Sequence, residues 1–192
     1  MQLAEAVLEG FGLGRYEVAS YARPGHQCRH NMAYWTGRPY LGLGTNASSM
    51  LTVKGYLRLC EVCPQLPPAP CAAERVRLTM TTGRARLAEK PALAAQSFSL
   101  EFLTGAQAAA EDLMLGARLA GGLDPGLVAH AGEVLAEGEL RTCLDGLLAD
   151  GLLDEVDGRL APTERGWLLG NELYERLWDL APGEVASAEA RA

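Results

Sequence analysis

The segment from residue 16 to residue 44 gathers the side chains best suited to bind a ligand. It holds five of the twelve aromatic residues of the chain in 29 positions, namely Tyr16, Tyr21, Tyr34, Trp35 and Tyr40. His26, His30 and Asn31 lie among them. Aromatic faces beside an imidazole suit a flat conjugated molecule, and histidine is a common axial ligand of haem iron. A histidine beside aromatic rings is more often a hydrogen-bonded structural residue, so on the residues alone both interpretations stay open.

Charged side chains in and next to this segment add further candidates. The arginines there could hold the propionate carboxylates of a porphyrin, because guanidinium matches carboxylate geometry; they are Arg15, Arg23, Arg29 and Arg38. Glu17 lies between apolar neighbours in a predicted strand, where an inward-facing carboxylate is costly unless it is paired. Glu17 is therefore a candidate pocket residue, with a solvent-facing position as the alternative.

The five cysteines do not have the spacing of a metal site. Cys60 and Cys63 form a C-x2-C pair and Cys71 follows eight residues later. Zinc and iron–sulfur sites need three or four thiolates or histidines, so we expect free thiols in a surface connector. An odd number of cysteines also favours a reducing compartment over a disulfide framework.

Short elements separated by glycine are predicted to position the aromatic segment. Apolar residues share one face of a helix over residues 3–11, and glycines end it before a strand over residues 16–21. A loop or short helix over 29–35 and a strand over 40–44 follow. This order is what the last units of an α/β barrel would leave, and the uncapped first helix favours a chain cut from something longer. Further on, residues 75–87 are predicted to form a hairpin of alternating basic and apolar residues.

The second half of the chain is predicted to be mainly helical. We expect helices over residues 104–119 and 140–148, then a hairpin with an Asp157-Gly158 turn, then a helix capped by Thr163. That order is winged-helix-like. The predicted fold class is therefore α/β (α+β), in three parts: the end of a partial barrel (1–95), a winged-helix-like helical domain (96–180) and a disordered tail (181–192).

The charge of the chain is unevenly distributed. Residues 1–100 carry 11 Lys+Arg and 6 Asp+Glu, whereas residues 101–192 carry 6 and 18, a net charge of −12. An acidic half cannot displace the counterions of a phosphate backbone, so no nucleic-acid partner is expected. No apolar run is long enough to span a membrane, and no signal peptide is apparent. These features predict a cytoplasmic protein.

Two stretches of the sequence resemble a known family. Residues 16–35 read Y-E-V-A-S-Y-A-R-P-G-H-Q-C-R-H-N-M-A-Y-W, and Y-L-G-L-G follows at 40–44. Residues 150–153, 157–160 and 163–166 read D-G-L-L, D-G-R-L and T-E-R-G. Both stretches resemble HemW-type haem chaperones, which are radical-SAM proteins related to oxygen-independent coproporphyrinogen III oxidase. The resemblance covers most of residues 1–180 and is most specific at 16–44.

This resemblance implies haem binding at an H-N-x-x-Y motif, which maps onto His30, Asn31 and Tyr34. His30 is then the expected axial ligand of the iron. Tyr34 and Trp35 are expected to pack on the macrocycle, and Arg29 to hold a propionate. The implied function is to bind haem or a porphyrin and to pass haem to an acceptor haemoprotein.

The chain departs from that family in its cysteines. The family carries C-x3-C-x2-C for a [4Fe–4S] cluster that binds S-adenosyl-L-methionine, and no such spacing occurs here. We therefore expect no radical-SAM catalysis by this chain alone, and a separately encoded N-terminal half is a candidate partner. Two alternatives stay open: a substrate-contact fragment of coproporphyrinogen dehydrogenase in porphyrin biosynthesis, and an inert remnant.

Overall fold

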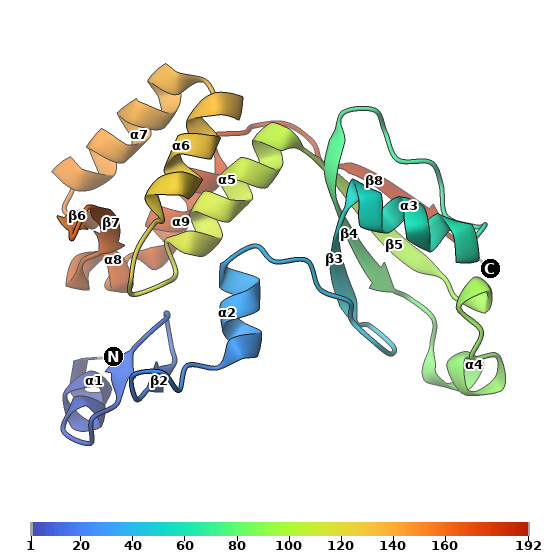
Figure 1. Ribbon diagram of the computed structural model, residues 1–192, viewed down its shortest axis with the longest axis horizontal. Coiled ribbons are helices and arrows are strands. Elements are labelled where there is room, and N and C mark those ends of the chain that lie inside the picture. The colour runs from blue at the N-terminus through green and yellow to red at the C-terminus, as the bar shows by residue number, and fades with distance from the viewer. Residues whose placement is uncertain (1, 192) are drawn as a thin grey trace. The chain divides into compact units, whose positions relative to one another are not determined.

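The chain folds as two compact units in a computed structural model that describes residues 2–191. Unit 1 comprises the residues up to Gly37 together with Ala109–Pro182, and unit 2 comprises Arg38–Ala108 with the chain from Gly183 onward. The division falls within helix α5 (Gly105–Gly116). Helices and strands occur in both units, which confirms a mixed α/β fold (Figure 1).

Unit 2 is built on a four-stranded antiparallel sheet in the order β3-β4-β5-β8. Its elements are β3 (Ser48–Thr52), α3 (Val53–Val62), β4 (Ala73–Met80), α4 (Arg84–Glu89), a 3-10 turn (Leu93–Ala95), β5 (Phe98–Thr104) and β8 (Ala186–Ala190). Alternate residues of β4 and β5 are buried, as a sheet with one covered face requires. On the other face, Arg77 of β4 pairs with Glu101, its partner in register on β5, at 2.8 Å.

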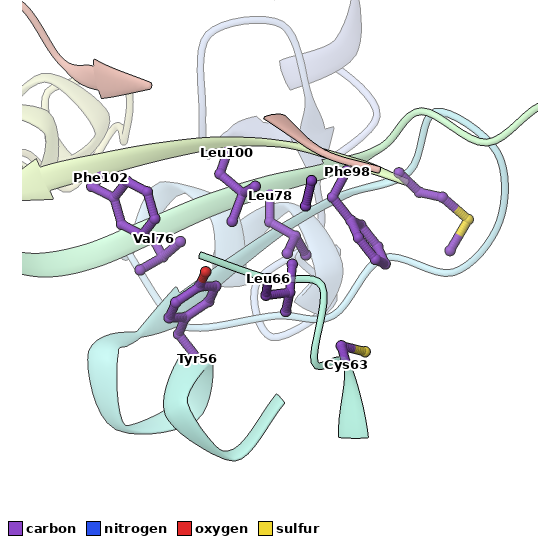
Figure 2. Close-up of a cluster of buried hydrophobic side chains, with 10 residues drawn as sticks. Tyr56, Cys63, Leu66, Val76, Leu78, Phe98, Leu100 and Phe102 are labelled. Carbon is purple, nitrogen blue, oxygen red and sulfur yellow. The ribbon is translucent and has the colours of Figure 1, made fainter. Parts of the chain in front are cut away.

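The core of unit 2 lies between the sheet and helix α3 (Figure 2). Tyr56 of α3 is completely buried and its ring meets Phe102 of β5 edge to face at 5.6 Å. The Tyr56 hydroxyl donates to the carbonyl oxygen of Pro67 at 2.6 Å, so the polar end of a buried ring is satisfied. The remaining core side chains include Val76, Leu78, Phe98 and Leu100.

Two parts of unit 2 differ from the sequence prediction. The hairpin predicted over residues 75–87 is wrong: the alternation in β4 is correct, but the chain from Arg84 forms helix α4, because its Ala, Arg, Leu and Glu residues favour helix. The partner of β4 is instead β5. The tail predicted to be disordered contains β8, which pairs with β5 and buries Ala190. Strand addition needs chiefly backbone donors and acceptors, so its alanine-rich sequence gave little sign of it.

Unit 1 combines short N-terminal elements with a set of helices. Its elements are α1 (Gln2–Glu9), β1 (Gly14–Arg15), β2 (Tyr21–Ala22), α2 (Arg29–Trp35), α6 (Pro125–Val134), α7 (Glu137–Ala149), β6 (Leu153–Val156), β7 (Arg159–Pro162), α8 (Glu164–Leu168) and α9 (Gly170–Trp178). The strand predicted over residues 16–21 is instead a bend between β1 and β2, which pair antiparallel. Each sheet formed by residues 2–191 is open and antiparallel. No closed barrel is therefore formed by this part of the chain.

The C-terminal hairpin of unit 1 agrees with the sequence prediction. Asp157 and Gly158 have φ angles of 50° and 72° and join β6 to β7, as expected for an Asp-Gly turn. The Thr163 hydroxyl accepts a hydrogen bond from the backbone N–H of Gly166 at 2.9 Å and so caps α8. Gly166 lies so close to the carbonyl oxygen of Leu152 that a Cβ there would collide with it. The T-x-x-G sequence is thus explained by local packing.

None of the helices in the described residues combines the length and hydrophobicity needed to cross a bilayer.

Substitution of Leu100 tests the core of unit 2. Leu100 is completely buried, whereas Leu43 in the same unit is 84% exposed. We expect Leu100→Ala to lower the free energy of unfolding by about 2–5 kcal/mol, because it removes buried methyl groups and leaves a cavity. Leu43→Ala is the matched control and should change it by less than about 0.5 kcal/mol. Urea denaturation measures both, and equal effects would contradict the described sheet packing.

Substitution of Gly166 tests the close approach of α8 to the hairpin. Gly166→Ala should destabilise unit 1 by roughly 1–3 kcal/mol, because the added methyl group has no room beside Leu152. Gly146 lies inside α7 with open space around it, so Gly146→Ala should stabilise by about 0.5–1 kcal/mol. Opposite shifts in Tm are therefore expected for two identical substitutions, and a neutral Gly166→Ala variant would overturn this packing.

Candidate functional site

The H-N-x-x-Y motif lies on helix α2, which has seven residues and contains no buried residue. Cys28 precedes it and makes no side-chain cap. At its C-terminal end the Thr36 hydroxyl donates to the carbonyl oxygen of Met32 at 2.6 Å. A helix this short is unstable alone in water, so its position depends on contacts with the rest of unit 1.

His30 and Tyr34 share one face of α2, as residues four apart do. Their ring centroids are 4.7 Å apart and the ring planes are perpendicular. His30 and the neighbouring Arg29 are both exposed. Within residues 2–191, no hydrogen bond or ion pair engages the side chain of either residue. The imidazole is therefore accessible, and its nitrogens are free to act as a ligand.

Asn31 points to a different neighbour. Its side-chain amide donates to the Tyr16 hydroxyl at 3.3 Å. The carbonyl oxygen of Tyr16 in turn accepts from the backbone N–H of Ala120 at 3.0 Å. Asn31 therefore ties α2 to the N-terminal segment, which is itself bonded to the turn that follows α5.

Trp35 does not join the His30–Tyr34 pair. It is partly buried, and the guanidinium carbon of Arg118 lies 5.4 Å from the centroid of its ring. The same guanidinium lies 4.0 Å from the ring centroid of Tyr174, on α9. Sequence reasoning did not identify Arg118 or Tyr174. The available signal was weak: Arg118 is one of six basic residues in the acidic half of the chain.

Glu17 is buried, with 4% of its surface exposed, so the solvent-facing alternative is wrong. It forms an isolated β-bridge with Leu119. Its charge acts together with those of two arginines on Tyr174. Burial raises the pKa of Tyr174, Arg118 lowers it, Glu17 raises it and Arg15 lowers it. Glu17, Arg15 and Arg118 thus all lie close enough to Tyr174 for their charges to act on it.

Arg15 forms a second cation–π cluster in unit 1. Its side chain is 5% exposed and donates to Glu5 at 3.0 Å and to the Tyr21 hydroxyl at 2.8 Å. Its guanidinium lies 5.0 Å from the ring centroid of Trp167 and 5.4 Å from that of Tyr21. This cluster holds β1 and β2 against α8, and both of its rings lie outside α2.

The cysteines do not fit an iron–sulfur cluster. Cys63 is buried in the core of unit 2, and burial, followed by the charge of Cys60, raises the pKa of its thiol. Cys28 and Cys71 are exposed and Cys143 is partly buried in unit 1. In the part of the chain that the structure describes, no three His, Cys, Asp or Glu side chains form a group that could hold a metal ion.

Helix α2 and the segment before it carry side chains that could hold a haem. His30 offers an exposed imidazole, and Arg29 and Arg23 are exposed cations without a carboxylate partner in the described residues. A groove between α7 and α9 contains Cys143 but none of the predicted site residues. Burial raises the pKa of that thiol, so it is mainly protonated and a poor nucleophile at neutral pH.

Comparison with known proteins finds HemW haem chaperones. The chain is 30% identical over 176 residues to "Heme chaperone HemW" of Mycobacterium tuberculosis, an alignment that covers 92% of this chain and 38% of that protein. It is 23% identical over 173 residues to the protein of the same name from Bacillus subtilis, an alignment that covers 90% of this chain and 40% of that protein. A shorter stretch of 54 residues is 48% identical to the HemW of Synechocystis sp., covering 28% of this chain and 13% of that protein.

No family model and no solved structure matches the chain. It spans about two fifths of the length of the two relatives that match it along most of its own length. The chain is therefore a homologue of the HemW haem chaperones.

Proposed function

We propose that this chain forms the haem-contact part of a HemW-type haem chaperone, with His30 as an axial ligand of the iron. The observation that carries the proposal is the exposed imidazole of His30, paired edge to face with Tyr34 and free of hydrogen bonds within residues 2–191. Homology to proteins named haem chaperones supports it.

Each residue of α2 has a distinct role in this proposal. Bound haem supplies an iron atom that accepts a nitrogen ligand at an axial position. His30 provides that nitrogen, and Tyr34 limits the rotation of the imidazole ring. Arg29 holds a propionate through a charge-assisted hydrogen bond. Trp35 supports the helix from its buried side instead of packing on the macrocycle. Asn31 fixes the helix through Tyr16.

An exposed ligand is consistent with delivery of haem to another protein. A buried site would hold the ligand tightly and release it slowly, because differences in affinity lie mostly in the dissociation rate. His30 lies on a short surface helix, and Arg29 and Arg23 are also exposed. An acceptor haemoprotein could therefore approach the haem from the open side without unfolding the donor.

We further propose that residues 1–95 form the end of a radical-SAM barrel, as the resemblance to the family implies. The [4Fe–4S] cluster and S-adenosyl-L-methionine would be held by groups other than the cysteines of this chain, which lack the C-x3-C-x2-C spacing. The order α6, α7, β6, β7, α8 and α9 supports a winged-helix-like arrangement within unit 1, in the later part of the domain predicted over residues 96–180; β5, at the start of that range, belongs to the sheet of unit 2. The free thiols support a cytoplasmic location.

A haem titration followed at the Soret band tests the proposed ligand. His30→Ala should weaken binding at least tenfold, about 1.4 kcal/mol, because it removes the bond to iron. His26→Ala is the matched control, since His26 is also exposed and lies four residues away. Saturation near one haem per chain is expected for the unmodified protein.

Binding that is lost equally in both histidine variants would point to general surface adsorption. Binding that is indifferent to His30 would refute the assignment of the ligand.

A further inference from the structure

We propose that Arg118 is the positioning residue for His30, acting through Trp35 and the turn of residues 118–120. This inference rests on the proposed haem function. Arg118 lies immediately after α5, far from the H-N-x-x-Y motif in sequence, and it belongs to the same unit as α2.

The first contact is a guanidinium held between two aromatic rings. Arg118 lies 4.0 Å from the ring centroid of Tyr174 and 5.4 Å from that of Trp35. Tyr174 is 7% exposed, and its ring packs so closely on Gly170 that a Cβ there would collide with it. The planar guanidinium can stack on both rings, which an ammonium group does poorly. Arg118 thus connects α2, through Trp35, to the packed helix α9, through Tyr174.

No hydrogen bond satisfies the buried Nε of Arg118, the indole N–H of Trp35 or the hydroxyl of Tyr174 within the described part of the chain. Stacking is therefore the main interaction that fixes the guanidinium. Such an interaction is short-ranged and sensitive to side-chain shape. Replacing Arg118 should consequently loosen Trp35 more than it perturbs the backbone around residue 118.

The second contact reaches the other end of the motif. Leu119 forms a β-bridge with Glu17, and the backbone N–H of Ala120 donates to the carbonyl oxygen of Tyr16. The Tyr16 hydroxyl then accepts from Asn31. The turn of residues 118–120 is therefore connected to α2 at Asn31 and again at Trp35. Tyr34 lies between these two points in the sequence, and the exposed His30 directly precedes the first of them.

Helix α2 depends on such anchors because it has little stability of its own. It has seven residues, no side-chain N-cap and no buried residue. Just beyond it, Gly37 has a φ of 61° and a Cβ there would collide with the side chain of Asp112, on α5. Tertiary contacts therefore fix the position of α2, and Arg118 supplies one of them at Trp35, the residue next to Tyr34.

The experiment compares three variants: Arg118→Met, Arg118→Lys and Arg15→Met. Arg15 is the matched control because it also contacts two aromatic rings in unit 1, those of Tyr21 and Trp167, and both rings lie outside α2. Two quantities are measured for each: amide hydrogen exchange of α2 in the haem-free protein, and the Kd for haem from the Soret titration. Tm is recorded to separate local from global loss of stability.

Arg118→Met should speed α2 exchange about tenfold and raise the Kd for haem about tenfold. The free energy of one desolvated cation–π contact corresponds to a change of about this size. Arg118→Lys should change α2 exchange and the Kd for haem less than Arg118→Met does. Arg15→Met should lower Tm and speed exchange in β1 and β2, with α2 exchange and Kd nearly unchanged.

Unchanged α2 exchange in Arg118→Met, or an equal effect in Arg15→Met, would overturn the inference. Faster exchange with an unchanged Kd would also overturn it, because the helix would then be loosened without consequence for the ligand. Failure of the proposed function is recognised separately: the unmodified protein would bind no haem, or would bind it regardless of His30, before any arginine variant is considered.

Discussion

A single arginine held between two aromatic rings links the helical part of unit 1 to the segment that carries the H-N-x-x-Y motif. Arg118 stacks on Tyr174 of α9 and on Trp35 of α2. The N-terminal 37 residues contain short elements, and α1 exposes Leu3 and Val7 to solvent. They cannot build a core of their own, so their order depends on this contact, on the Arg15 cluster and on the bridge between Glu17 and Leu119. Removing the Arg118 contact would loosen helix α2, whereas removing the Arg15 cluster would loosen β1 and β2.

The motif therefore has an exposed side and a supporting side. His30 and Arg29 are exposed, whereas Asn31 and Trp35 are partly buried and contact Tyr16 and Arg118. In the proposed function, the exposed residues would touch the ligand and the partly buried ones would hold the helix in place. In this chain the buried Glu17 belongs to the supporting side, where its backbone bridges Leu119.

Local chemistry explains which features could be predicted from the sequence. The Asp157-Gly158 turn, the Thr163 cap and the apolar alternation of β4 each follow from neighbouring residues. The Arg118–Trp35 contact and the pairing of β8 with β5 join residues far apart in the chain, and no local pattern encodes them. The hairpin predicted over residues 75–87 failed for the same reason, since β4 finds its partner beyond α4. The resemblance identified His30 as a candidate ligand, but its exposure and its pairing with Tyr34 required the fold.

Direct observation of the bond between iron and His30 is the sharpest test of the haem assignment. The chain contains three histidines, His26, His30 and His130, so protein labelled with 15N in histidine alone can be examined by electron–nuclear double resonance as its ferric haem complex. We predict a strong coupling to a directly bound histidine nitrogen that is lost in His30→Ala and retained in His26→Ala and His130→Ala. A coupling that survives in His30→Ala, or that is absent from the unmodified complex, would contradict the account.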